Sequence, residues 1–193
     1  MASFAKRLMD LVASILLAPF ALIVCLLLMI LIRIESPGNP LFVQRRMGRG
    51  QRPFAMVKLR TMKADTAHVP SHEVAPLSIT RLGRFVRRFK LDELPQLWNV
   101  LTGTMSLVGP RPCLPSQRAL IEAREARGLF AFLPGVTGPA QVQGVDMSDP
   151  VRLAEVEAAY FGRAGLMDDI RILVRTLFGG GSGDAAAPAK GKE

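Results

Sequence analysis

The sequence predicts a helix-rich α+β protein, with an N-terminal re-entrant membrane helix and a small membrane-associated globular domain that contains a short β element. Three observations support this fold class. An uncharged run of 22 residues extends from Leu11 to Ile32, two strand-like segments follow it, and most later segments are amphipathic helices between Gly- and Pro-rich turns. We expect the membrane helix and its basic flank over residues 1–34, the cytoplasmic domain over 35–178, and a disordered tail over 179–193.

The apolar run is long enough to span a bilayer as a straight helix, so a single-span anchor is the simplest interpretation. It is too long for a signal-peptide core and lacks a small-residue cleavage site, so we expect it to be retained. Pro19 lies inside the run and predicts a kink. Basic residues flank both ends, which favours a bent helix that enters and leaves on the cytoplasmic side. These are Lys6, Arg7, Arg33, Arg45, Arg46, Arg49 and Arg52.

The composition indicates an anionic partner. The 193-residue chain has a net charge of +9, which suits nucleic acid, anionic lipid or a phosphorylated substrate. One Trp, one Tyr and no RNA-binding or zinc-finger pattern disfavour nucleic acid. Cys25 lies in the apolar run and Cys113 in the basic part, so no disulfide is expected and the default is a reduced, cytoplasm-facing protein.

Two short strands are predicted at residues 41–44 and 54–60, joined by an Arg-rich loop with Gly48 and Gly50. In the second strand Lys58 and Arg60 share one face. This pattern leaves two interpretations open, that both side chains bind one anion or that they are two solvated charges. Residues 63–78 are turn-prone and are expected to form a mobile loop. His68 and His72 have the spacing of a helical metal site, but Pro70 between them argues against it.

Several helices are predicted beyond this loop. Thr80 is placed to cap a basic helix over residues 81–89, and a surface helix is expected over 117–127. Residues 135–144 contain too many glycines for a helix and are expected to form a loop, a strand and a loop. Asp149 and Pro150 open a helix that runs to about Phe161, and the last helix covers residues 168–178.

The centre of the sequence is the adjacent carboxylate pair Asp92 and Glu93 at an expected helix start. An apolar face follows at i, i+3, i+4 and i+7, and Pro95 fits only in the first turn. Such a pair is often only a helix cap. Here cations surround it, which suits chemistry on a phosphate ester with a divalent metal. The apolar positions are Leu94, Leu97, Trp98 and Leu101; the cations are Arg81, Arg84, Arg87, Arg88, Lys90 and Arg111.

In this order the segments resemble the small monotopic phosphoglycosyl transferases of bacteria, the bacterial sugar transferase family. The resemblance extends from Lys6 to about Phe178 and includes the apolar segment with its internal proline. Four further motifs carry it: KLRTM at 58–62, LDELPQL at 91–97 with Asn99, MSLVGPRP at 105–112, and PGVTG at 134–138 followed by AQV at 140–142.

The resemblance implies transfer of a sugar-1-phosphate from a UDP-sugar to polyprenol phosphate, at the cytoplasmic face of the bacterial inner membrane, as the first membrane step of surface glycan synthesis. It implies that Asp92 is the nucleophile and binds Mg²⁺, and that Glu93 assists the second acceptor. The implied substrate- and phosphate-binding residues are Lys58, Arg60, Arg87, Arg111 and Gln141. The expected partners are therefore the UDP-sugar, polyprenol phosphate and membrane lipid, without nucleic acid, and a homo-oligomer is compatible with this interpretation.

The sequence departs from the family pattern at a few positions. Leu133 and Val145 stand where the family usually has Arg, and Glu157 stands in place of a usual Asp. The missing arginines reduce the number of cations expected near a diphosphate. The alternative functions are a non-catalytic membrane anchor or scaffold for glycan enzymes and a membrane-tethered nucleic-acid binder.

Overall fold

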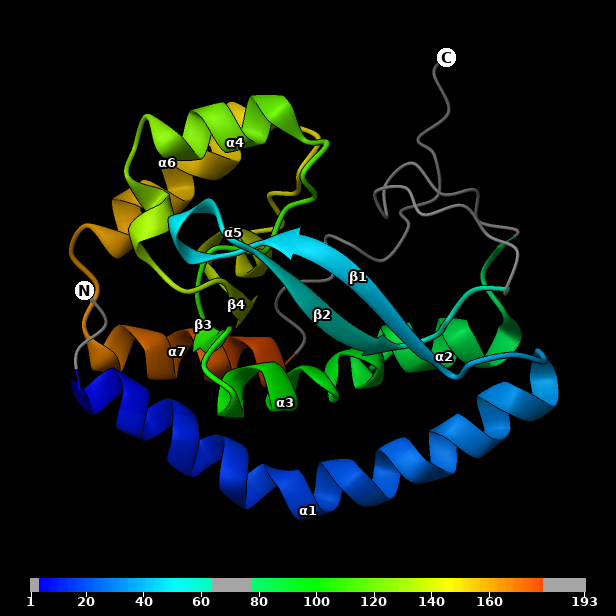
Figure 1. The fold of residues 1–193 in the computed structure, drawn as a ribbon. Helices are drawn as coiled ribbons and strands as arrows, with labels where there is room; N and C mark the ends of the chain where they lie inside the picture. The colour runs from blue at the N-terminus through cyan, green and yellow to red at the C-terminus, as the bar shows by residue number, and fades with distance from the viewer. Residues whose placement is uncertain (1–3, 64–77, 179–193) are drawn as a thin grey trace.

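The structure is a computed structural model that describes residues 4–63 and 78–178. Figure 1 shows a long helix, α1 (Phe4–Glu35), running beneath a globular part made of shorter helices and two small two-stranded sheets. This arrangement confirms the predicted helix-rich α+β class. The predicted tail and the two histidines lie outside the described residues.

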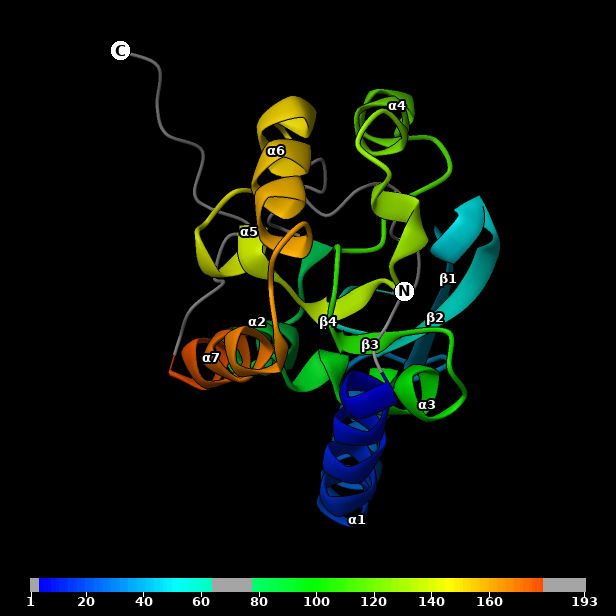
Figure 2. The same ribbon diagram turned by 90° about the vertical axis from the view of Figure 1, so that its left-hand side faces the viewer.

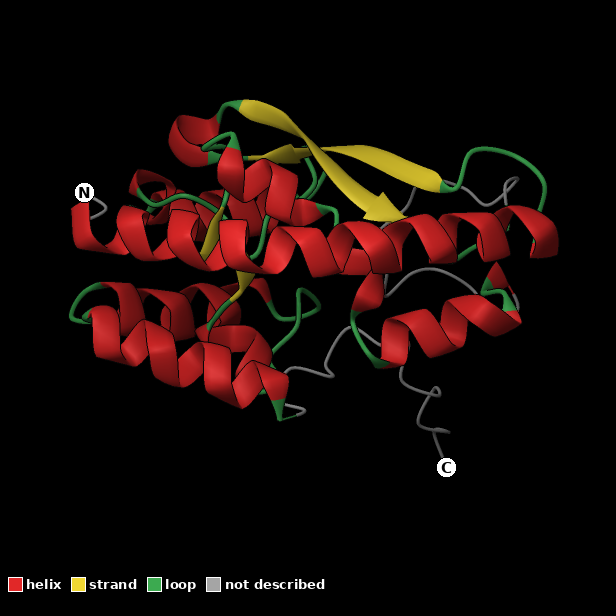
Figure 3. Ribbon diagram, turned by 90° about the horizontal axis from the view of Figure 1, so that it is seen from below, coloured by secondary structure: helices red, strands yellow, loops and turns green. Residues whose placement is uncertain are grey.

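Helix α1 has 32 residues and is long and apolar enough to cross a membrane. Seen from below, it crosses the full length of the molecule (Figure 3). Pro19 is an interior residue of an unbroken helix, which is bowed about its middle with its convex side away from the globular part (Figure 1). The buried residues lie along one face, at Asp10, Ser14, Ala21, Cys25, Leu28 and Ile32. Large apolar side chains stay exposed along the rest of the helix, from Phe4 to Ile34, and associate the protein with a membrane.

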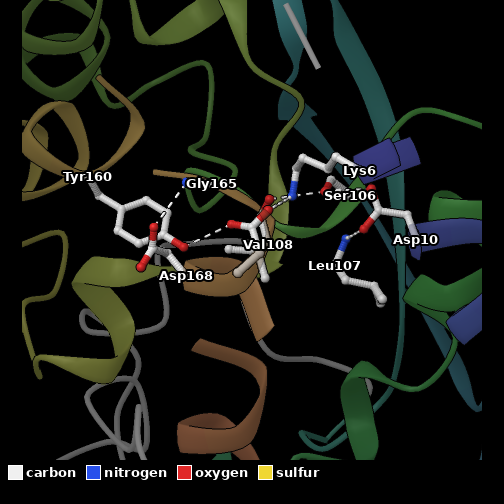
Figure 4. A network of polar contacts seen from close by, with 9 residues as sticks. Lys6, Asp10, Ser106, Leu107, Val108, Tyr160, Gly165 and Asp168 are labelled. Atoms are coloured by element: carbon white, nitrogen blue, oxygen red, sulfur yellow. Dashed lines mark hydrogen bonds and ion pairs between the residues drawn. The ribbon is translucent and has the colours of Figure 1, made fainter. Parts of the chain in front are cut away.

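Polar contacts tie the N-terminal end of α1 to the globular part (Figure 4). Lys6 Nζ lies 2.6 Å from Asp169 Oδ2, and Tyr160 donates to the other oxygen of that carboxylate at 2.8 Å. One turn further, the buried carboxylate of Asp10 accepts from Ser106 Oγ at 2.8 Å and from the Leu107 backbone N–H at 3.1 Å. A charged residue inside an apolar helix is thereby satisfied by the domain.

The C-terminal end of α1 is tied to the same globular part. Glu35 accepts from the backbone N–H of Arg81 at 2.8 Å, and the Arg60 guanidinium donates to the carbonyl oxygens of Ser36 and Pro37, which follow the helix. Both ends of α1 therefore contact one domain.

Strands β1 (Leu41–Met47) and β2 (Pro53–Leu59) form the predicted antiparallel hairpin, in which Leu41 pairs with Leu59 and Met47 with Pro53. The short 3₁₀ helix η1 (Arg49–Gln51) closes it, with Gly50 at a φ of 63°. Because glycine adopts positive φ without steric cost, this tight closure is available here.

Helix α2 (Arg81–Arg88) begins as predicted, with Thr80 Oγ1 accepting from the Gly83 N–H at 2.9 Å. The prediction that Asp92 and Glu93 begin the following helix is only partly correct. The carboxylate pair lies in a separate 3₁₀ turn, η3 (Leu91–Glu93), and helix α3 (Gln96–Leu101) begins after Pro95.

The buried face of α3 also differs from the apolar face seen in the sequence. Gln96, Asn99 and Val100 are buried, whereas Trp98 is 65% exposed. The reason is Asn99, whose side chain accepts from the Val57 N–H at 3.2 Å and donates to the Ala55 carbonyl oxygen at 2.8 Å. These bonds join α3 to β2 and leave Trp98 exposed, while Leu94 and Leu97 pack at the edges of the apolar clusters.

A parallel pair of short strands, β3 (Ser106–Val108) and β4 (Gly135–Thr137), lies at the centre. Within residues 135–144, predicted as a loop, a strand and a loop, residues 139–142 instead form the short helix α5 (Pro139–Val142). Pro139 fits its first helical position, where no N–H is needed. Just beyond β3, a Cβ on Gly109 would collide with the Leu133 carbonyl oxygen, so this backbone crossing requires glycine.

The remaining helices cover the two sides of this pair. Helices α4 (Arg118–Glu125) and α6 (Pro150–Phe161) lie on the side away from α1, with η4 (Leu129–Ala131), while α7 (Leu166–Leu177) lies on the side of α1 (Figures 1 and 2). Asp149 caps α6 as predicted, accepting from the Arg152 N–H at 3.1 Å.

Candidate active site

The carboxylate pair lies where the chain turns from α2 into η3. Lys90, the residue just before η3, has a φ of 55°, in the left-handed region that non-glycine residues seldom occupy. Such backbone conformations are concentrated at functional sites, where the surrounding structure maintains them.

Glu93 is held by two cations from distant segments. Lys58 Nζ from β2 lies 2.8 Å from Glu93 Oε1, and Arg111 Nη2, beyond β3, lies 3.4 Å from the same oxygen. The Glu93 side chain is only 13% exposed. Burial opposes its ionisation, but the charges of Lys58 and Arg111 prevail and lower the pKa of Glu93 to about 2. Glu93 is therefore a fixed anion that orients two cations.

Asp92 has a different environment from its neighbour. No cation in the described parts of the chain forms an ion pair with it. Burial and the negative charge of Glu93 raise the pKa of Asp92, against the opposing charges of Lys58, Arg87 and Arg111. Adjacent carboxyl groups whose environments push their pKa values apart are typical of two separate roles. The arrangement leaves the Asp92 carboxylate available to a ligand.

Arg87 and Arg60 have different positions relative to the pair. Arg87 on α2 donates to Thr61 Oγ1 at 2.8 Å, and it lies close enough for its charge to lower the pKa of Asp92. Arg60 instead binds the backbone carbonyls that follow α1. Among the described residues, Lys58 pairs with Glu93 whereas Arg60 bonds to main-chain carbonyls, so the structure does not bring these two side chains to one group. A phosphate-binding role of Arg60 stays a prediction.

Gln141 lies on α5, just beyond β4, and is 9% exposed. Its side-chain oxygen has no hydrogen-bond partner in the described protein. Arg111 follows β3 in the same way, so the two predicted ligand-binding side chains come from the carboxyl ends of paired parallel strands. Such ends are common sites of ligand binding.

The arrangement of carboxylates also limits how a metal could bind. Among residues 4–63 and 78–178, no three His, Cys, Asp or Glu side chains are grouped to hold an ion. Glu93 is engaged by two cations, so Asp92 is the carboxylate that would hold a bound Mg²⁺. Mg²⁺ commonly binds one or two carboxylates and completes its shell with water and substrate phosphates, so this donor set fits it.

Sequence reasoning missed a buried ion pair behind Arg111. Arg124 on α4 and Glu157 on α6 bond at 2.6 and 2.8 Å and are almost fully buried. A signal for them exists. Arg124 is four residues after Leu120 and Glu157 four after Leu153, so each charge continues the buried apolar face of its helix.

The family model for the bacterial sugar transferase matches residues 1–180. The chain belongs to this family. A Caulobacter vibrioides relative, the UDP-glucose:undecaprenyl-phosphate glucose-1-phosphate transferase, is 40% identical over 89% of this chain and 68% of its own length. The chain is 33% identical to the UDP-N-acetylgalactosamine-undecaprenyl-phosphate N-acetylgalactosaminephosphotransferase of Aeromonas hydrophila, and 37% identical to the undecaprenyl-phosphate glucose phosphotransferase of Komagataeibacter xylinus.

This sugar transferase covers 43% and 35% of the lengths of the latter two relatives. Within the shared region it has no cation at Val145, which packs against the apolar cluster beside α4 and α6. In the described parts of the chain, the cations whose charges act on the carboxylate pair include Lys58, Arg87, Lys90 and Arg111.

Proposed function

We propose that this sugar transferase moves a sugar-1-phosphate from a UDP-sugar to a polyprenol phosphate, such as undecaprenyl phosphate, and releases UMP. The observation that supports this most directly is that the two adjacent carboxylates have different contacts. Glu93 holds Lys58 and Arg111, while Asp92 stays unpaired among the described residues. The relatives' substrates suggest the two reactants.

In the first half-reaction an oxygen of the Asp92 carboxylate attacks the phosphorus that carries the sugar. The bond between this phosphorus and the bridging oxygen breaks, and UMP leaves with that oxygen. The product on the protein is an aspartyl-phosphosugar. Lys58 and Arg111, fixed by Glu93, stabilise negative charge on the phosphoryl oxygens, and Arg87 adds to the positive field. Mg²⁺ held by Asp92 would supply further neutralisation of the diphosphate charge.

In the second half-reaction a phosphate oxygen of the polyprenol phosphate attacks the same phosphorus. The acyl-phosphate bond to Asp92 breaks, the carboxylate is restored, and a polyprenyl-diphospho-sugar leaves. Glu93 has its pKa lowered to about 2 and stays anionic, so its part is to position cations and acceptor rather than to carry a proton.

The two half-reactions are separable by experiment. Protein in lipid nanodiscs is given a panel of UDP-sugars and Mg²⁺ without polyprenol phosphate. We expect about one UMP per active site and a matching sugar-phosphate mass on Asp92. Asp92→Asn should form no adduct, whereas Glu122→Gln, which removes an exposed carboxylate on α4, should behave as wild type. UMP release that requires both substrates, with no adduct, would indicate direct transfer.

We also propose that both ends of α1 lie on the cytoplasmic face. About 32 residues of helix extend about 48 Å, well beyond the hydrocarbon thickness of about 30 Å. A spanning helix would place one end across the bilayer from the domain. Lys6 instead contacts Asp169, and Glu35 contacts the start of α2.

Single cysteines at Ser3 and Asn39, in a protein with Cys25 and Cys113 replaced by Ala, test this topology. Both should resist an impermeant thiol reagent added outside intact cells and react after lysis. Labelling of either position from outside would refute the proposed topology.

A further inference from the structure

The buried pair Arg124–Glu157 lies directly behind Arg111 and bonds to its main chain. The Arg111 N–H donates to Glu157 Oε1 at 3.2 Å, and Arg124 Nη1 donates to the Arg111 carbonyl oxygen at 2.7 Å. Both backbone polar groups of Arg111 are thus held by one ion pair, which two other helices contribute. The side chain of the same residue reaches Glu93.

The opposite side of this segment is fixed by β4. Gly109 N–H donates to the Thr137 carbonyl oxygen at 3.0 Å, and Gly135 N–H donates to that of Pro110 at 2.9 Å. Neither glycine has room for a Cβ at this crossing. Residues 109–111 are therefore held between a sheet crossing and an ion pair, so the Arg111 backbone has little freedom to move.

Burying the Arg124–Glu157 ion pair costs free energy of desolvation. The Arg124 and Glu157 side chains are only 3% and 1% exposed, so both charges have lost their hydration. An apolar pair of similar volume often stabilises a protein as well or better. The surrounding cluster is apolar, with Leu120, Ile121 and Leu153 beside Cys113. What an apolar pair lacks is the ability to hold an N–H and a carbonyl together.

We propose that Arg124 and Glu157 are positioning residues that set the Arg111 guanidinium for the diphosphate of the sugar donor. The inference rests on the proposed function, since Arg111 needs accurate placement only if a phosphoryl group is transferred at Asp92. A displacement of about 1 Å in such a group costs roughly a hundredfold in rate.

The test is the double variant Arg124→Met/Glu157→Leu, assayed in nanodiscs for UMP release with UDP-sugar, Mg²⁺ and undecaprenyl phosphate. We expect kcat/KM, measured well below the unfolding transition, to fall about ten- to a hundredfold. The thermal unfolding temperature should fall by only several degrees, because the apolar side chains fill the space but leave the Arg111 N–H and carbonyl without their partners. The matched control is Arg127→Met/Glu155→Leu, which removes an ion pair between the turn that follows α4 and helix α6. That pair is 29% and 59% exposed, and its loss should leave activity unchanged.

A double-mutant cycle separates positioning from general support of the fold. If the pair acts through Arg111, its removal in an Arg111→Met background should cost no further activity. Should the apolar variant unfold, Arg124→Lys serves in its place, because it keeps the charge but lacks the fork that bonds Glu157 and the Arg111 carbonyl together. We expect a several-fold loss that Arg111→Met again abolishes.

Wild-type kcat/KM in the apolar variant, or losses that add to that of Arg111→Met, would overturn the positioning role. Failure of the proposed function has a different signature. In that case wild type itself would release no UMP with any UDP-sugar and acceptor.

Discussion

Neutralising the two adjacent carboxylates one at a time should move the stability of the folded protein in opposite directions. At neutral pH, Asp92→Asn should stabilise the protein and Glu93→Gln should destabilise it. Both substitutions keep the size of the side chain and remove its charge. The expected difference in sign follows from the environments of the two groups.

Glu93 has a folded-state pKa of about 2, below its ordinary value of 4.5, so its ionisation stabilises the folded state. That stability is fully present above pH 4.5 and is lost as the pH falls towards 2. The difference corresponds to about 3 kcal/mol at neutral pH. Glu93→Gln also leaves the partly buried cations of Lys58 and Arg111 without their anion. For a chain of this length the apparent unfolding temperature should fall by about 6–12 °C.

Asp92 has its pKa raised, chiefly by burial, so its ionised form is less favourable in the folded protein than in the unfolded chain. This cost is present at neutral pH, after ionisation, and is relieved as the pH falls through the raised pKa. Asp92→Asn removes it and should raise the unfolding temperature while abolishing UMP release. Stability gained where activity is lost is typical of active sites.

The assay is thermal unfolding by circular dichroism in nanodiscs at pH 7.5, without substrate. Glu122→Gln is the control for loss of an exposed carboxylate and should change the unfolding temperature little. If Asp92→Asn lowers that temperature as much as Glu93→Gln does, the two carboxylates have similar environments and the assignment of separate roles fails.

Three further outcomes follow from the contacts around the site. Lys58→Met should raise the pKa of both Asp92 and Glu93, because the charge of Lys58 lowers both. The acidic limb of the pH profile of kcat/KM for UMP release should therefore move to higher pH. An unmoved limb would mean that Lys58 does not control the charge of the two carboxylates. Arg60→Met should lower the unfolding temperature yet leave the KM for UDP-sugar near wild type, because Arg60 binds carbonyls after α1; a KM raised tenfold would place it at the substrate. Asn99→Leu should cost about 2 kcal/mol in urea unfolding, because two backbone groups of β2 lose their partner; an unchanged midpoint would contradict this role.

Local features of the sequence determined most of the secondary structure. The apolar run specifies α1, alternation and glycine specify the hairpin, and side-chain caps at Thr80 and Asp149 specify the starts of α2 and α6. These signals act over a few residues, so they can be interpreted without knowledge of the fold. The short α-helix α5 was missed, because it has only four residues and begins after Gly138.

The location of the site could be predicted from the sequence, but the contacts between its charged side chains could not. The motif at residues 91–97 and the nearby arginines indicated the region, and Lys58, Arg87 and Arg111 do lie at the pair. Arg60 shares the motif of Lys58, yet its guanidinium goes to the end of α1. Which cation meets which anion depends on where the strand ends and what packs beside it.

The tertiary structure alone decided which carboxylate is held and which is left available. It also joined Arg124 to Glu157, two charges 33 positions apart in the chain, behind the backbone of Arg111. Each of these residues, taken alone, is only an unexpected charge on an apolar helix face. A buried charge requires a partner, and the partner is chosen by how helices pack in space, which no local pattern of residues specifies.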